Sequence, residues 1–348
     1  MNAKPIYPPA QGKPYKRKMS RNARRENLTG YAFLIPWLIG IFVFTAFPFI
    51  WSMFLAFTDY NFIKEAKFVG LDNWKRMFSI KESGFDLRAF LRSDLFLSLK
   101  ATFTYTVWHV PIHLILAFAA AMALNRKIKG IGVYRTIFYL PSFIGGSIGV
   151  AVMWKLFFSD QGFVNAIIRQ LGFESVKFFS STQNAIYTLI GISMYTLGGQ
   201  MLIFLAGLQE VPQELYESAT IDGAGNVAKF RKITLPLMSP IVLYNFIMAI
   251  IGSLQVFGSA FVITQGGPAK STYFFALYLY EEAFVYFRLG YASALAWFIF
   301  FIIMIFTAIV LKVSGGMVFY ESGMAQSKRS AREEIKAKRK LQRGGVRV

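Results

Sequence analysis

Residues 214–240 read ELYESATIDGAGNVAKFRKITLPLMSP, a polar stretch that lies between two long apolar segments. Within it, Glu217-Ser218-Ala219 is followed after three residues by Gly223, and after nine more by Ile233-Thr234-Leu235-Pro236. Several fixed offsets in one loop are far more specific than a single short motif. The stretch therefore indicates a surface with a dedicated partner, against the plainer interpretation of an ordinary loop that contains a helix.

The same stretch predicts a short surface helix followed by a tight turn. Pro212 suits a helix start, where its missing N–H costs nothing, and Glu214 and Glu217 fall in the following turns, where the helix dipole favours negative charge. Asp222-Gly223 is typical of a turn, because glycine adopts positive φ without strain. The small residues that leave this backbone open to a partner are Ala219, Gly223, Ala224 and Gly225.

The composition indicates a membrane protein. Of the 348 residues, 55% are hydrophobic and 17% aromatic. The mean hydropathy is +0.44, which is too apolar for a soluble domain of this size. Six stretches with few or no charges approach the roughly 20 residues that a membrane-spanning helix needs. The sequence thus predicts an all-α, polytopic membrane protein with six transmembrane helices, at about 30–57, 95–124, 136–158, 185–207, 238–263 and 290–312.

The predicted spans divide the chain into three parts. The first span is too long, and too interrupted by Pro36 and Pro48, to be a cleaved signal peptide, so we expect it to remain as a membrane anchor. The three parts are a basic tail at 1–28, a transmembrane domain at 29–313 with a polar loop at 208–237, and a second basic tail at 314–348.

The distribution of positive charge predicts the orientation. A formal net charge of +20 is also typical of nucleic-acid binding, but Lys and Arg concentrate in both tails and in the loop after the second span. A six-span chain places these segments on one side of the membrane. The opposite loops, 58–94, 159–184 and 264–289, hold fewer Lys and Arg, and acidic residues balance most of them. Both termini and the Glu217 loop are therefore predicted to be cytoplasmic, with membrane lipid rather than nucleic acid as the partner of the tails.

The position of the acidic residues bears on the energy source. All 18 Asp and Glu residues lie outside the predicted spans, whereas a proton- or sodium-coupled carrier usually needs a buried ionisable group. The chain also lacks the G-x-x-x-x-G-K-[ST] pattern that cradles ATP phosphates. We therefore expect no enzymatic activity and no cofactor on this chain, and ATP chemistry only on a partner subunit.

Two histidines are the only candidates for a metal site. His109 and His113 lie four residues apart around Pro111 in the second span, and the chain has no cysteine. Two imidazoles with no nearby carboxylate or thiol leave a coordination shell incomplete. We expect hydrogen bonding inside the helix bundle instead, and no metal.

Beyond the loop, short motifs lie in order along nearly the whole chain. They are Phe68-Val69-Gly70-Leu71-Asp72-Asn73-Trp74, Asn125-Arg126-Lys127, Tyr134-Arg135, Tyr139-Leu140-Pro141, Phe204-Leu205-Ala206-Gly207-Leu208-Gln209, Gly266-Gly267-Pro268 and Gly290-Tyr291-Ala292-Ser293-Ala294. With the loop, they resemble the permease subunits of binding-protein-dependent ABC importers, in the sugar-transporting branch of that family. Ser218 replaces the commoner Ala, and the basic tails are longer than the family requires.

The resemblance implies the type I importer permease fold and a set of partners. These partners are a second permease subunit, two ATPase subunits that bind the ATP, an extracytoplasmic solute-binding protein, and a sugar or oligosaccharide as substrate. It also implies that residues 208–237 form the coupling loop on which the ATPase docks. The residues expected to carry coupling are Glu217, Ser218, Ala219, Asp222, Gly223, Ala224 and Gly225.

The substrate path is expected in the fourth and fifth spans, where aromatic and neutral polar groups lie in apolar surroundings. A gap-free alignment with a maltose-type permease places seven residues at sugar-contacting positions, and Gln255 adds a nearby polar group. Small residues at helical spacing are also typical of helix packing, and the sequence leaves both interpretations open. The predicted path is Tyr195, Thr196, Gly199, Ala249, Gly252, Ser253, Val256 and Gln255.

Two other functions compete with the importer permease. A secondary carrier or channel for a small polar solute fits six spans, but it leaves the Glu217 motif unexplained and lacks an intramembrane carboxylate. A membrane-embedded enzyme needs a nucleophile, a base or a metal cluster, and the predicted spans contain none.

Overall fold

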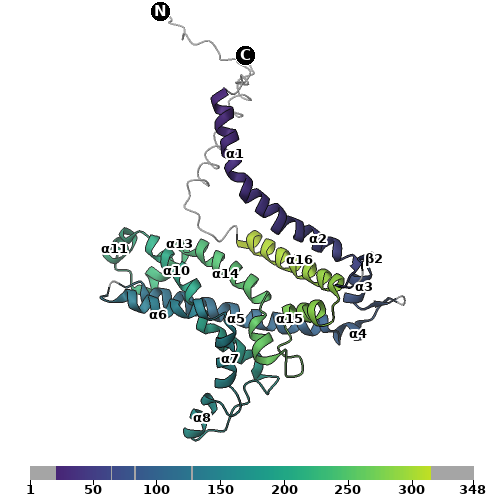
Figure 1. The fold of residues 1–348 in the computed structure, drawn as a ribbon. Helices are drawn as coiled ribbons and strands as arrows, with labels where there is room; N and C mark the ends of the chain where they lie inside the picture. The colour runs from purple at the N-terminus through teal and green to yellow at the C-terminus, as the bar shows by residue number, and fades with distance from the viewer. Residues whose placement is uncertain (1–20, 64, 82–83, 127, 315–348) are drawn as a thin grey trace, which may run out of the picture. The chain divides into compact units, whose positions relative to one another are not determined.

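The structure is a computed structural model, which describes residues 21–63, 65–81, 84–126 and 128–314. The described chain is helical apart from two short antiparallel strand pairs (Figure 1), and it divides after Phe54 into two compact units. In order, the elements are α1 Arg21–Ile41, η1 Phe42–Ala46, α2 Phe47–Leu55, β1 Thr58–Asp59, β2 Lys67–Phe68, α3 Asp72–Met77, β3 Ile80–Lys81, β4 Gly84–Phe85, α4 Leu87–Leu91, α5 Asp94–Leu124, α6 Ile131–Ile144, α7 Ile148–Phe157, α8 Phe163–Gln170, α9 Asn184–Ser193, η2 Met194–Thr196, α10 Gly198–Glu210, α11 Gln213–Ile221, α12 Asn226–Lys229, η3 Phe230–Thr234, α13 Leu235–Leu237, α14 Ser239–Leu254, η4 Ala260–Thr264, α15 Phe275–Tyr280, η5 Glu281–Val285 and α16 Leu289–Ser314.

The described residues of the N-terminal unit, 21–54, belong to one continuous helical run that ends at Leu55. Within it, Thr29–Leu55 is long and apolar enough to cross a membrane, as predicted for the first span. The π-helical turn η1 comes just before Pro48. A proline ring clashes with the carbonyl four residues earlier in a regular α-helix, so the wider turn explains how the run continues past it.

Two further helices, α5 and α16, are long and apolar enough to span a membrane unbroken. The remaining candidates are helix pairs bent at a short break, by 101° between α6 and α7, 50° between the α9–η2 run and α10, and 66° between the α12–α13 run and α14. With each pair counted once, the described chain has up to six candidate spans by length and composition, which agrees with the predicted number. The bends were not predicted, because hydropathy reports the length of a span and not the direction of its axis.

The sharpest bend follows from a pair of glycines. Gly145 and Gly146 separate α6 from α7, and a β-carbon on Gly145 would lie 2.2 Å from Cγ2 of Thr196. The glycine therefore allows the end of α6 to approach η2 closely. Ser147 then caps α7, because its Oγ accepts a hydrogen bond from the backbone N–H of Val150 at 3.4 Å.

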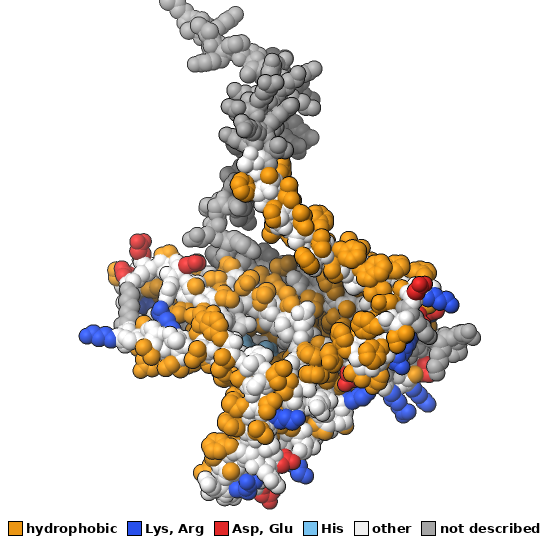
Figure 2. Space-filling model, viewed as in Figure 1, with side chains coloured by type: hydrophobic (Ala, Val, Ile, Leu, Met, Phe, Trp, Pro, Cys, Tyr) orange, Lys and Arg blue, Asp and Glu red, His pale blue; other side chains and the backbone are white. Residues whose placement is uncertain are grey.

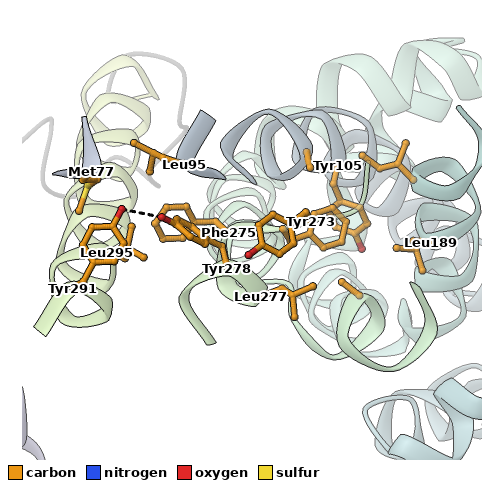
Figure 3. Packing of buried hydrophobic residues seen from close by; sticks show 14 of the residues in the cluster. Met77, Leu95, Tyr105, Leu189, Tyr273, Phe275, Leu277, Tyr278, Tyr291 and Leu295 are labelled. Atoms are coloured by element: carbon orange, nitrogen blue, oxygen red, sulfur yellow. Dashed lines mark hydrogen bonds between the residues drawn. The ribbon is translucent and has the colours of Figure 1, made fainter. Parts of the chain in front are cut away.

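Helix α5 lies at the centre of the larger unit and packs against α9, α10, α14 and α15. One buried cluster joins α5 to α9, α15 and α16, and a second joins α5 to α10 and α14. Figure 3 shows the first cluster, in which the hydroxyl groups of Tyr278 and Tyr291 lie 2.8 Å apart and form a hydrogen bond. Burial of this apolar area on both sides of α5 fixes the positions of the bent helices around it.

Two of the sequence motifs hold the region between the first and second spans in place. The side-chain amide of Asn73 donates to the carbonyl oxygens of Ala56 at 3.0 Å and Thr58 at 2.9 Å. A β-carbon on Gly290 would lie only 1.9 Å from the carbonyl oxygen of Thr58, so only glycine fits there. The Asn73 and Gly290 motifs thus join β1 and α3 to the start of α16.

Figure 2 shows where charge lies on one face of the protein. Hydrophobic side chains cover most of the larger unit, and Lys, Arg, Asp and Glu gather near α11, near α3 and α4, and near α8. A membrane-embedded body with polar ends has this distribution.

Candidate functional site

The predicted surface helix in the 208–237 loop is present. α11 begins directly after Pro212, as expected, and ends at Ile221. Asp222 and Gly223 form the turn, and Gly223 has a φ of +76°, a conformation that favours glycine. The backbone N–H of Ala224 donates to the carbonyl of Ala219 at 2.8 Å, which closes the helix end in the manner of a Schellman motif.

Two side-chain contacts fix α11 against the segment that follows it. The hydroxyl groups of Tyr216 and Thr234 lie 2.8 Å apart and form a hydrogen bond. The Lys229 ammonium donates to Oγ1 of Thr220, also at 2.8 Å. Because residues 9 and 18 positions apart along the chain are joined, α11 and the α12–α13 run form one connected unit.

The structure brings all seven predicted coupling residues together on α11 and the turn after it. Glu217 is exposed, and its carboxylate accepts a hydrogen bond from the Gln213 amide at 3.0 Å. Gly223 and Gly225 are exposed, and β-carbons added to them would meet no other atom within 4 Å. Ser218 and Asp222 are also exposed, whereas Ala219 and Ala224 are partly buried.

Two exposed apolar side chains border these small residues and were not predicted. Ile221 is 87% exposed at the end of α11, and Val227 is 71% exposed in α12. Large apolar groups exposed to this degree on a polar loop are typical of a protein contact surface. Their signal in the sequence was the pair of apolar residues that flanks the Asp222–Gly225 turn.

A cavity of about 210 Å³ lies where the bent spans meet. Its wall comes from the α6–α7 break, from α9 and η2, and from the segment between α14 and η4. Three aromatic side chains line it, those of Tyr105, Trp154 and Tyr195. Four hydroxyl-bearing residues also line it: Ser147, Ser193, Thr196 and Ser259.

Three of the eight predicted path residues line this cavity: Tyr195, Thr196 and Val256. Ala249 and Ser253 instead lie buried, with 4% and 2% exposure, and the Ser253 hydroxyl donates to the carbonyl of Ile250 at 2.9 Å. Gly252 is exposed, Gly199 is partly buried, and β-carbons on either would meet no other atom within 4 Å, while Gln255 is exposed. The structure thus gathers part of the predicted set, and the sugar path stays a prediction.

Sequence reasoning missed Trp154, which lies in the cavity wall. Its ring packs edge-on against Tyr195 with centroids 5.6 Å apart. Its indole nitrogen is buried without a hydrogen-bond partner among the described residues. A buried indole N–H normally finds an acceptor, and no described residue supplies one here. Contact between the third and fourth spans depends on tertiary packing, and no local sequence pattern predicts it.

Comparisons with known proteins agree with this geometry. Residues 102–318 match the model of the family described as "Binding-protein-dependent transport system inner membrane component". The chain belongs to this family. The permease is 42% identical to the probable ABC transporter permease protein YesP of Bacillus subtilis, over 88% of its own length and 96% of that relative. It is 32% identical to the trehalose/maltose transport system permease protein MalF of Thermococcus litoralis, over 83% and 94% of the two chains.

Solved structures show the same fold. The permease superposes on a chain of a bacterial ABC transporter involved in the import of the acidic polysaccharide alginate, with a TM-score of 0.72 and 22% identity, over 86% of this chain and 98% of that one. A second match, with a TM-score of 0.71 and 22% identity over 84% and 96% of the two chains, is the alginate transporter in complex with its alginate pentasaccharide-bound periplasmic protein. The predicted fold class, an importer permease fold built from helices, is confirmed.

The histidine pair of the permease lies in the core next to the cavity wall. Nε2 of His113 lies 3.1 Å from Oε1 of Gln200 on α10, which confirms the expected hydrogen bond inside the bundle for His113. His109 stacks on Tyr105 with ring centroids 4.9 Å apart. Across the described part of the chain, no group of three or more His, Cys, Asp or Glu side chains is placed to hold a metal ion.

Outside the spans, the segment between η4 and α16 carries a buried tyrosine–glutamate pair. The Tyr273 hydroxyl donates to the Glu281 carboxylate at 2.5 Å. Burial raises the pKa of Tyr273 above its ordinary value, and the hydrogen bond with Glu281 raises it further. The phenol therefore keeps its proton at physiological pH and remains a donor to Glu281.

Proposed function

We propose that the permease carries a sugar or oligosaccharide across the cytoplasmic membrane as one of two permease subunits, driven by two ATPase subunits that dock on the Glu217–Gly223 surface. An extracytoplasmic solute-binding protein would deliver the substrate. The single observation that carries this proposal is structural: one rigid helix, α10, joins the coupling surface to the wall of the cavity.

The path of force can be followed residue by residue. η2 holds Tyr195 and Thr196, and a single residue separates it from the start of α10. At the other end of α10, two residues lead to the start of α11. α10 has 13 residues, so it reaches about 20 Å. A displacement of α11 by a docked ATPase would therefore move the cavity wall as a rigid body.

The contacts at the far end of α10 would extend this movement to the third span. A β-carbon on Gly198 would lie 2.5 Å from the carbonyl oxygen of Phe138, so α10 and α6 touch through their backbones. Gly145 makes a similarly close approach to Thr196. The bend between α6 and α7 cannot stay in place if α10 shifts, and alternating access would follow from that coupling.

The cavity lining supports a neutral, hydroxyl-rich substrate. Its lining residues include aromatic rings, hydroxyl groups and glycines, but no Asp, Glu, Lys, Arg or His. Lys155 follows Trp154 in sequence but does not line the cavity, and its Nζ donates to the carbonyl of Val262 at 3.4 Å. Aromatic faces with neutral hydrogen-bonding groups are typical of sugar sites, and broken helices near the bilayer midplane are typical of transporter sites.

Names of relatives support the same substrate class. The relatives include permeases named for trehalose/maltose, arabinooligosaccharide and multiple-sugar transport. We further propose that both termini are cytoplasmic, with tails at 1–28 and 314–348 and the coupling loop at 208–237 on the same side, because this places the Lys- and Arg-rich segments inside.

The test is labelled-sugar uptake by vesicles that contain the complete importer, with Trp154→Phe as the variant. Phe keeps the ring and removes the unpartnered indole N–H, so we expect weaker uptake with assembly unchanged. Trp108→Phe is the control, because Trp108 is half exposed and does not line the cavity. Equal uptake by the parent and by Trp154→Phe would show that the Trp154 indole N–H does not contribute to the sugar site. Uptake without ATP would contradict the proposed function itself.

A further inference from the structure

A second cavity, of about 520 Å³, lies at the N-terminal ends of α5 and α9, beside the loop that holds residues 269–271. It shares no lining residue with the cavity of about 210 Å³ that Trp154 and Tyr195 line. The coupling loop follows the C-terminal end of α10, whereas this cavity lies at the start of the same bent span. It therefore lies at the end of the bundle away from the coupling surface.

Two lysines give this cavity its charge. Lys100 and Lys270 both line it, and no Asp or Glu does. Lys270 forms an ion pair with Asp94 at 2.5 Å and lies 4.9 Å from the centre of the Tyr273 ring. Lys100 is exposed, and its ammonium group has no hydrogen bond or ion pair with any described residue. One positive charge in the cavity therefore remains without an acidic partner.

Neutral polar side chains line the cavity together with the two lysines. Thr104, Thr182 and Gln183 line the cavity with them. Ser271 also lines it, and its hydroxyl oxygen is buried without a hydrogen-bond partner in the described chain. The ten-residue helix α9 starts here after Gln183, and no side chain caps its first turn. Backbone N–H groups at a helix start add a further preference for negative charge.

A pair of aromatic rings on the same two helices lies beside the cavity, and one of them, Tyr187, lines it. Trp108 on α5 and Tyr187 on α9 pack edge-on with centroids 6.3 Å apart. They are 50% and 52% exposed. Trp108 lies near the middle of the 31-residue helix α5, whereas Tyr187 lies in the first turn of α9, where an exposed Tyr is typical of the level of the lipid headgroups. Lys100 lies in the second turn of α5, and Lys270 pairs with Asp94, the first residue of that helix, so both ammonium groups lie at its N-terminal end.

A snorkelling lysine is the plainer account of Lys100. It does not explain the uncapped helix start or the buried hydroxyl of Ser271 without a partner. We propose that this cavity binds a single phosphate or carboxylate group at the outer membrane interface. A phosphate would come from an anionic lipid headgroup, and a carboxylate from an acidic solute in the surrounding solution that is not the transported sugar.

The test uses Lys100→Gln in the complete importer, because Lys100 is exposed and its loss leaves no acidic partner unpaired. Lys100→Arg keeps the charge, and Lys67→Gln removes an exposed lysine of β2 that lies outside the cavity. The first probe is lipid retention by native mass spectrometry, with phosphatidylglycerol compared with phosphatidylcholine. The second is equilibrium dialysis with radiolabelled digalacturonate.

A charged hydrogen bond is worth enough that its loss should weaken binding roughly tenfold. A fall in phosphatidylglycerol retention for Lys100→Gln, with Lys100→Arg and Lys67→Gln near the parent, supports the site with a lipid phosphate as its ligand. A fall in digalacturonate binding alone supports the site with a carboxylated solute as its ligand. If Lys100→Gln matches the parent with both probes, or the parent binds neither, the proposal is wrong.

Discussion

Replacement of Gly223 by Trp tests the coupling surface most sharply. Gly223 has a φ of +76°, and a β-carbon there would meet no atom of the permease within 4 Å. The substitution therefore costs about 1–2 kcal/mol of backbone strain, and its β-carbon meets no other part of the chain. Any larger effect has to arise from what docks on the turn.

The structure supplies a matched control in Gly172. Its φ is +83°, it follows α8 on the surface, and a β-carbon on it would also meet nothing within 4 Å. Gly172→Trp carries the same strain and the same added ring, and it lies outside the coupling loop. The difference between the two variants therefore isolates docking.

A bulky side chain forced into a close-packed contact costs about 1–3 kcal/mol, which corresponds to roughly 5- to 150-fold weaker binding. The assay is recovery of the ATPase subunits with affinity-tagged permease from membranes, normalised to inserted permease. We expect Gly223→Trp to lose most of the ATPase and Gly172→Trp to retain it. Equal recovery with the two variants would refute the role assigned to this turn.

Other glycines test the sugar path and the packing. Gly252→Trp adds a ring where the chain leaves open space. Sugar uptake by this variant should fall at least about tenfold with assembly intact, compared with Gly132→Trp on exposed α6. Unchanged uptake would exclude Gly252 from the sugar path. Gly290→Ala, whose β-carbon would lie 1.9 Å from the Thr58 carbonyl oxygen, should cost about 1–3 kcal/mol of stability, seen as a lower melting temperature than that of Gly149→Ala. The purified permease alone should hydrolyse no ATP, and measurable turnover that survives further purification would contradict this.

The structure also changes which variants are informative for the sugar path. Ser253 is 2% exposed and bonded to its own helix, so a Trp there would disrupt packing whether or not sugar passes nearby. Ile250 packs against the second buried cluster, so a Trp at that position would also disrupt packing. Gly252 separates the two explanations because it has open space beside it.

The sequence predicted the features that depend on local chemistry. Pro212 and the Asp222-Gly223 pair predicted the start of α11 and the turn after it, because a proline and a positive-φ glycine act through their own backbones. Apolar length predicted the number of spans. The order of motifs such as Gly266-Gly267-Pro268 predicted the family.

The remaining features depend on contacts between distant residues. The 101° bend between α6 and α7 places Trp154 against Tyr195, and hydropathy contains no information about that direction. The buried positions of Ala249 and Ser253 depend on which neighbours α14 meets. The cavity could not be assembled from a helical spacing alone, because helix packing and pore lining use the same spacing.

The most direct test of the central claim is the energy source of uptake. The complete importer would be reconstituted in vesicles with labelled sugar, chosen as the one that its binding protein retains, and with an ionophore that abolishes proton and sodium gradients. The account predicts uptake that requires ATP on the side of α11, persists with the ionophore, and is lost with Gly223→Trp. Uptake that proceeds without ATP and disappears with the ionophore would contradict it.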